Sequence, residues 1–192
     1  MSLREALFRY RGYTPIPFLL VVVIFARPTP LSLAIGLAGV LLGESLRFWG
    51  VAYAGPLTRV TGNVGAPELV VAGPFAFVRN PLYVGNMIMY VSVGIMANAL
   101  MPWLVVVAAV YFYFQYAMIV SLEEEFLVKR FEGEYRLYTR AVPRFLPAFR
   151  SFRPARAVDQ RPDWKGGLRS ERRTLQAVGL VVIILIVRWW VG

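Results

Sequence analysis

Apolar residues are gathered in five stretches along the chain, and short polar segments separate them. The stretches cover residues 13–26, 31–54, 81–97, 102–121 and 174–191. A helix that crosses the hydrocarbon layer needs about 20 mostly apolar residues, and the first stretch is short but dense. The pattern therefore predicts an all-α integral membrane protein, a helical bundle of about five transmembrane helices. The turn residues near 98 and 102 predict a tight hairpin between the third and fourth helices.

The first stretch is also compatible with a secretory signal peptide. Arg4, Arg9 and Arg11 would supply the basic segment that precedes such a peptide. However, Pro28 and Pro30 lead directly into the second stretch without a clear cleavage site. We therefore favour a transmembrane helix.

Basic residues are distributed unevenly between the two ends of the predicted helices. Three arginines precede the first stretch, Arg59 and Arg79 follow the second, and thirteen Lys and Arg lie within 122–173. The opposite side has only Arg27 and Arg188. Because basic loops stay in the cytoplasm, we expect the N-terminus and these loops to be cytoplasmic and the C-terminus to lie outside.

The amino-acid composition limits the partners and the catalytic groups that the protein can use. The chain is 58% hydrophobic and carries a formal net charge of +10. Since its basic residues cluster beside apolar stretches, we expect an anionic membrane surface rather than nucleic acid as the partner. The sequence has no cysteine, which excludes thiol chemistry, and no histidine, the commonest general base and metal ligand. We expect no metal site, and any catalysis must use carboxylates, Tyr, Arg, Lys or a bound cofactor.

A polar, proline-containing segment interrupts the apolar pattern before the third stretch. It reads GPFAFVRNPLYVG and covers 73–85. Asn80 precedes a proline and is therefore disfavoured in the α conformation, while Pro81 suits the first turn of a helix. Arg79 and Asn80 would thus lie at a helix N-terminus, a favourable place for an anionic ligand group. The alternative is a capped helix with an interfacial arginine.

A second unusual segment, 121–147, continues the fourth stretch beyond the membrane and contains three consecutive carboxylates. Glu125 and Glu132 each have a basic residue four positions later, which predicts solvated ion pairs. Glu124 shares its helix face with apolar and aromatic residues only, and Glu123 has no basic residue four positions later. A carboxylate at the hydrocarbon boundary is costly unless it is used. The alternative is a carboxylate that hydrogen-bonds to a loop.

Two features within the stretches carry weaker predictions. Glu44 and Arg47 lie one helical turn apart, so they could neutralise each other or line a cleft. The aromatic run 111–116, YFYFQY, could bind a cation or an adenine ring, although packing or an aromatic belt is the commoner role.

Together, the two polar segments resemble the signature of a family of integral membrane methyltransferases. This family includes isoprenylcysteine carboxyl methyltransferase and phosphatidylethanolamine N-methyltransferase. The first block, 69–85, is similar to the family pattern GPY-x-x-VRHP-x-Y-x-G, and the second block, 121–147, to E-E-x-x-L-x-x-x-F-G-x-x-Y-x-x-Y with its VPRFLP-like tail. The fifth stretch and residues 148–173 lie outside the resemblance.

Three positions depart from the family pattern. Asn80 replaces a histidine, as in the phospholipid branch, and Phe75 replaces a tyrosine. Glu132 stands where glycine is usual, with Gly133 one place later, so the end of the helix could be shifted.

The resemblance implies S-adenosylmethionine as the methyl donor, bound at the cytoplasmic mouth of the bundle between the two blocks, with a lipid or lipophilic small molecule as acceptor. By motif position, nine residues are candidates. Catalytic roles would fall to Arg79 and Glu124. The cofactor would be bound by Asn80, Pro81, Tyr83, Gly85, Glu123 and Tyr135. The substrate would be bound by Arg144.

Phospholipid headgroup N-methylation is the favoured reaction, and carboxyl methylation of an isoprenylcysteine-like or other lipophilic acid is the alternative. An NADPH-dependent sterol-type reductase shares a similar arginine-histidine-proline block but usually has more helices, and a non-catalytic membrane scaffold would leave Glu123 and Glu124 unexplained. The expected organisation is a methyltransferase core (1–147), a basic cytoplasmic linker (148–173) and an additional transmembrane helix (174–192). We expect a chain ending at Phe149 to retain cofactor binding. The sequence does not indicate the oligomeric state.

Overall fold

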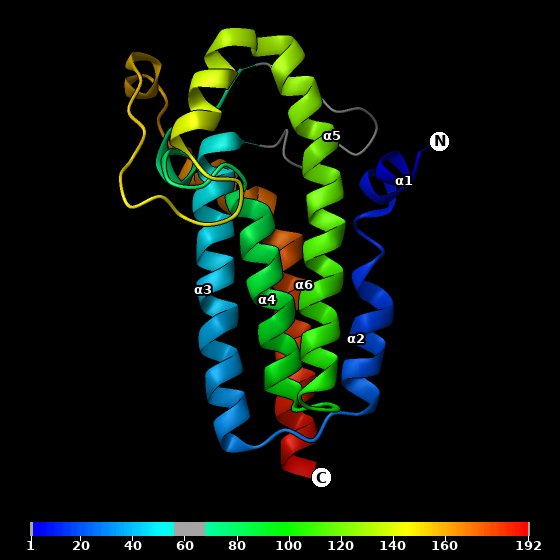
Figure 1. Ribbon diagram of the computed structural model, residues 1–192. Coiled ribbons are helices and arrows are strands. Elements are labelled where there is room, and N and C mark those ends of the chain that lie inside the picture. Colours follow the sequence, from blue (N-terminus) through cyan, green and yellow to red (C-terminus); the bar gives the residue numbers. More distant parts are fainter. Residues whose placement is uncertain (1, 56–67, 192) are drawn as a thin grey trace.

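A computed structural model describes residues 2–55 and 68–191, so Arg59 lies outside the described residues. The described residues form six α-helices and two short 3-10 helices, without a strand, which confirms the all-α prediction. The helices are α1 (Leu3–Tyr10), α2 (Pro15–Ile24), α3 (Pro30–Ala54), α4 (Pro81–Ala97), α5 (Trp103–Ala141) and α6 (Trp164–Val191), with η2 (Gly73–Ala76) and η3 (Ala155–Val158) between them. Figure 1 shows α2 to α6 running along one bundle, whose two ends carry the N- and C-termini.

The apolar stretches of the sequence correspond to α2 to α6, and the tight hairpin between α4 and α5 is confirmed. Among the described residues, α3, α5 and α6 are long and apolar enough to cross a membrane. A fourth crossing results if α1 and α2, which are bent by 58°, count as one span, whereas α4 has only 17 residues. The count of five transmembrane helices therefore stays a prediction.

The contact between α3 and α4 is close enough to involve backbone directly. A Cβ atom on Gly43 would lie 2.7 Å from the carbonyl oxygen of Gly85, and one on Gly85 would lie 2.6 Å from that of Gly43. Small residues at such positions allow helices in a membrane to approach closely. The same approach places Arg47 of α3 against Gly85, so α3 and α4 form the unit on which the polar side chains of this region are mounted.

The long helix α5 extends beyond the bundle, and its chain then turns back over the end of the bundle (Figure 1). The turn occurs at Glu132, whose φ of 39° and ψ of −115° are not helical. The predicted shift near Glu132 is thus a break at the position where the family has glycine, and it removes the helical spacing that predicted an ion pair for Glu132. The returning segment buries Tyr135, Tyr138 and Val142 against the first block.

The segment that the sequence predicted to be a basic linker is bonded to the first block. The amide of Ala148 donates to Phe77 O (2.7 Å) and that of Phe152 to Ala76 O (2.9 Å). The side chain of Gln160 accepts from the amides of Val71 and Ala72 at 2.9 and 3.1 Å. Helix α6 then begins at Trp164, ten residues before the predicted apolar stretch. The segment is therefore part of the folded unit.

Replacing Glu132 with glycine should stabilise the protein. A side chain held at positive φ costs about 1–3 kcal/mol, and glycine adopts this region freely. We expect Glu132→Gly to raise the Tm of the detergent-solubilised protein by about 2–4 °C, which corresponds to about 1 kcal/mol for a chain of this size. As the matched control, Glu134→Gly changes a helical position and should lower the Tm. A lower Tm for both variants would contradict the strain at Glu132.

Candidate active site

The two blocks enclose one end of a cavity of about 980 Å³. Its polar wall includes Arg47, Asn80, Tyr83, Asn86, Glu123 and Tyr135. Its apolar wall includes Ile16 and Leu19 of α2, Met89 and Val93 of α4, and Val178 and Val181 of α6. The cavity is therefore lined by charged and aromatic residues as well as by apolar side chains of three helices.

Direct hydrogen bonds fasten the first block to the second. The amide of Arg79 donates to Pro143 O (2.9 Å), and the side-chain amide of Asn80 donates to Arg144 O (3.1 Å). The hydroxyl of Tyr138 donates to Phe75 O (2.7 Å). Asn80 is the N-cap residue of α4, yet its side chain does not cap that helix. Where the family has histidine, the asparagine side chain here holds the two blocks together.

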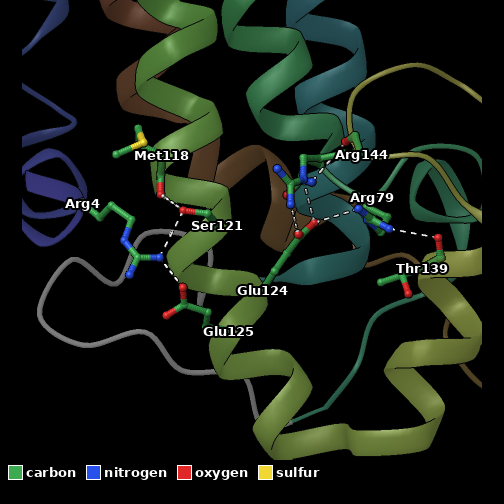
Figure 2. Close-up of polar contacts among 9 residues, drawn as sticks. Arg4, Arg79, Met118, Ser121, Glu124, Glu125, Thr139 and Arg144 are labelled. Atoms are coloured by element: carbon green, nitrogen blue, oxygen red, sulfur yellow. Dashed lines mark hydrogen bonds and ion pairs between the residues drawn. The ribbon is translucent and has the colours of Figure 1, made fainter.

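Glu124 is held between two arginines, as Figure 2 shows. Its Oε1 lies 3.0 Å from Arg79 Nη2 and 3.2 Å from Arg144 Nε, and its Oε2 also pairs with Arg144. Arg79 additionally donates to Thr139 O (3.1 Å). The sequence placed Glu124 on an apolar and aromatic helix face. The break at Glu132 returns the chain, so that Arg144 reaches this carboxylate from twenty residues later.

A further contact in Figure 2 joins α1 to α5. Arg4 forms an ion pair with Glu125 and lies 3.5 Å from the hydroxyl oxygen of Ser121. Glu125 thus pairs with α1 instead of the basic residue four positions later. This contact holds α1, whose Phe8 is on the cavity wall.

Glu123, in contrast to Glu124, faces the cavity. Tyr83 of α4 donates its hydroxyl proton to Glu123 Oε1 at 2.7 Å. The Tyr83 ring stacks on that of Tyr116 with 4.8 Å between centroids. A carboxylate beside two aromatic faces is an environment that accommodates a cation.

Arg47 occupies the centre of a polar cluster at the cavity wall. Its Nη2 lies 3.0 and 2.9 Å from the two carboxylate oxygens of Glu171 on α6. Its Nη1 donates to the side-chain oxygen of Asn86, and its Nε lies 3.6 Å from Glu44 Oε2. Asn86 in turn donates to the hydroxyl oxygen of Tyr116 (3.1 Å). Both interpretations of Glu44 and Arg47 from the sequence therefore hold: they pair, and Arg47 lines a cavity.

The structure brings most of the predicted site residues together. Those on the cavity wall are Arg79, Asn80, Pro81, Tyr83, Glu123 and Tyr135. Within the described residues, Glu124 and Arg144 lie beside this wall rather than on it, and Gly85 lies in the contact between α3 and α4. Sequence reasoning missed Asn86 and Glu171, because neither belongs to a motif and Glu171 falls in the segment predicted to be a linker.

Comparison with known proteins identifies the group to which this architecture belongs. A family model described as phospholipid methyltransferase matches residues 31–134, more than half of the chain. The chain belongs to the phospholipid methyltransferase family. The match spans α3, α4 and most of α5, whereas α6 lies outside it. Together with the three long apolar helices of the described residues, this membership indicates an integral membrane protein.

Two curated relatives carry names that refer to metal resistance. The chain is 31% identical over 125 residues to the cobalt-zinc-cadmium resistance protein CzcN of Cupriavidus metallidurans, which covers 65% of this chain and 53% of that protein. It is 31% identical over 121 residues to the nickel-cobalt-cadmium resistance protein NccN of Alcaligenes xylosoxydans xylosoxydans, covering 63% and 52%. The chain thus spans about half the length of these relatives. No solved structure matches it.

The described part of this phospholipid methyltransferase family member contains no group of three or more potential metal ligands among His, Cys, Asp and Glu. Its site consists instead of carboxylates, arginines and aromatic rings. These residues fit the donor that the family uses, because S-adenosylmethionine carries a sulfonium cation together with a carboxylate, and both Glu123 and Arg79 lie on the wall.

Replacing Glu124 with glutamine should destabilise the fold. Arg79 and Glu124 are mostly buried, with side-chain exposures of 12% and 14%. Removing the shared carboxylate leaves a buried arginine uncompensated, at a cost of about 3 kcal/mol. We expect Glu124→Gln to lower the Tm clearly more than the control Glu125→Gln, whose ion pair is exposed and worth about 0–1 kcal/mol. Equal Tm values for the two variants would contradict this role.

Proposed function

We propose that the protein transfers a methyl group from S-adenosylmethionine to a lipophilic membrane acceptor, and that this acceptor is the headgroup amine of a phospholipid. The observation that carries the proposal is the mixed lining of the cavity, which combines charged and aromatic residues of the blocks with apolar residues of α2, α4 and α6. Such a cavity suits an amphiphile whose headgroup reacts while its chain stays in apolar surroundings. Membership in the phospholipid methyltransferase family supports the reaction class.

The residues of the two blocks would hold the methyl donor. When bound, S-adenosylmethionine supplies an electrophilic methyl group on a positively charged sulfur. Glu123 and the stacked rings of Tyr83 and Tyr116 would compensate this charge. Arg79 would bind the carboxylate of the donor, because two arginines share Glu124 and the buried Nε of Arg79 has no hydrogen-bond partner in the described structure. Asn80, Pro81 and Tyr135 would shape the same part of the wall.

Glu123 is the residue placed to handle the acceptor's proton. An ammonium headgroup must lose a proton before its nitrogen can attack the methyl carbon. Glu123 is the carboxylate of the second block that faces the cavity, and the hydrogen bond from Tyr83 fixes its orientation. We therefore assign proton transfer to Glu123, whereas the family resemblance placed Glu124 among the catalytic residues. The remaining requirement is alignment of nucleophile and donor away from water, which the cavity walls would provide.

The two ends of the bundle suggest an orientation in the membrane. The N-terminus and both blocks lie at one end of the bundle in Figure 1, and the C-terminus lies at the other. The end that carries the blocks also carries the basic segment 122–173. The positive-inside rule favours the cytoplasm for this end, which would give a cytoplasmic active site and an external C-terminus.

Replacing Glu123 with glutamine should remove most of the activity while leaving donor binding in place. General base catalysis contributes about 10²–10⁴-fold to rates, so we expect kcat to fall at least about 100-fold. The affinity for S-adenosylhomocysteine, measured by calorimetry in detergent, should change little because this product has no sulfonium charge. Glu125→Gln serves as the matched control. A Glu123→Gln variant with near wild-type turnover would show that Glu123 is not the proton acceptor.

The pH dependence of the rate should identify the class of acceptor. An alkylammonium group has a pKa of about 10, so methylation of phosphatidylethanolamine should accelerate as pH rises from 6 to about 9. A carboxylate acceptor is already ionised at neutral pH, and its methylation should be flat above about pH 6. The measurement is transfer of labelled methyl groups to phosphatidylethanolamine, its monomethyl form and a farnesyl-cysteine analogue. Labelling of the farnesyl-cysteine analogue alone would replace N-methylation by carboxyl methylation.

A further inference from the structure

The proposed function uses α6 only as part of the apolar wall, yet α6 also brings a charged residue to the cavity. Glu171, Thr174, Ala177, Val178 and Val181 lie on its wall. Helix α6 is outside the family match and outside the sequence resemblance. The family match therefore says nothing about the contribution of α6.

Two contacts fix α6 one turn before Glu171. The amide of Asp163 donates to Ala52 O of α3 (2.8 Å), and a Cβ atom on Gly167 would lie 3.2 Å from the Cα of Ala52. Glu171 lies four residues after Gly167, so both project from the same face of α6. The start of α6 thus packs on α3, and this packing places the carboxylate of Glu171 beside Arg47.

Glu171 holds Arg47 in a way that Glu44 does not. Glu171 is 1% exposed, and both of its oxygens are within hydrogen-bond distance of Arg47 Nη2. Glu44 Oε2 lies 3.6 Å from the Nε, beyond hydrogen-bond distance. With Nη2 held by α6, Nη1 is directed at the oxygen of Asn86. Glu171 therefore determines the direction of the guanidinium.

The orientation of Arg47 determines how the side-chain amide of Asn86 is oriented at the cavity wall. A guanidinium only donates hydrogen bonds, so the Asn86 atom facing Arg47 must be its oxygen. The NH₂ group of Asn86 then faces Tyr116 and donates to the hydroxyl oxygen. Tyr116 must direct its own proton elsewhere, and its ring is the one on which Tyr83 stacks. Tyr83 in turn holds Glu123.

We propose that Glu171 is a positioning residue of the active site, which acts through Arg47 and Asn86 on the Tyr116 and Tyr83 pair that faces the acceptor headgroup. This inference rests on the proposed function. It places the influence of α6 at the Tyr83 and Tyr116 rings, where the sulfonium of the donor would meet the acceptor headgroup, whereas Arg79 would hold the carboxylate of the donor. A chain ending at Phe149 would lack Glu171; the expectation that such a chain retains cofactor binding stays a prediction.

The test compares three variants of the full-length protein with phosphatidylethanolamine as acceptor. Glu171→Gln and Asn86→Leu should each lower kcat/KM for this lipid by about tenfold or more, with S-adenosylhomocysteine affinity within about twofold of wild type. The kcat/KM of the double variant should be about that of the more impaired single variant, because the effects of residues that act through one route do not add. Arg172→Gln, an exposed neighbour on α6, is the control and should behave as wild type.

Several results would overturn the proposal. Multiplied losses in the double variant would show that Glu171 and Asn86 act independently. A lower Tm for Glu171→Gln with unchanged kcat and KM would show a purely structural ion pair. If Glu171→Gln does not fold, the exchange Arg47→Glu with Glu171→Arg decides: we expect a restored Tm without restored activity, since Asn86 loses its donor, and recovery of both would refute the positioning role.

A separate readout distinguishes failure of this inference from failure of the proposed function. Binding of S-adenosylhomocysteine should raise the Tm of the wild type. If this ligand does not raise the Tm and no lipid becomes labelled, the methyltransferase proposal is wrong. The role of Glu171 would then be read from the rise in Tm caused by dihexanoyl-phosphatidylethanolamine. This rise should be lost in Glu171→Gln and kept in Arg172→Gln; an equal rise in both would refute the inference.

Discussion

The fold depends on one constraint: an arginine beside the hydrocarbon layer must have a counter-charge within reach. An uncompensated charge in such surroundings costs several kcal/mol. Arg47 and Arg79 are both mostly buried, and each pairs with a carboxylate from a distant part of the chain, Glu171 on α6 and Glu124 on α5 respectively. These ion pairs connect the helical bundle to the segments that close its end.

Two local backbone features make these pairs possible. The glycine contact between α3 and α4 brings Arg47 within reach of Asn86, since a side chain on Gly85 would occupy the space taken by Arg47. The break of α5 at Glu132 turns the chain back, so Arg144 joins Arg79 at Glu124. Neither feature involves the cavity itself. Both determine which charged groups can meet there.

The sequence predicted features that depend on neighbouring residues, and it missed contacts between distant segments. Apolar stretches and prolines act locally, and they correctly predicted the helical class, the start of α4 at Pro81 and the hairpin after Ala97. The partner of Glu124 was not predictable from helical spacing, because Arg144 reaches it only after the break. Glu171 was missed for the same reason: its role arises from the packing of α6 on α3, which leaves no periodic pattern. Five of the six residues assigned to cofactor binding line one cavity, and their roles remain proposals.

The two charged clusters at the cavity differ in their ratio of arginines to carboxylates. Arg79 and Arg144 share the single carboxylate of Glu124, so this cluster has one positive charge in excess. Arg47 lies between Glu44 and Glu171, so two carboxylates flank a single arginine in the second cluster. Charge complementarity at a binding site favours a partner with the opposite arrangement. A zwitterion with separated anionic and cationic groups meets this condition, as both S-adenosylmethionine and a phosphatidylethanolamine headgroup do, whereas a prenylated carboxylate offers only the anionic half.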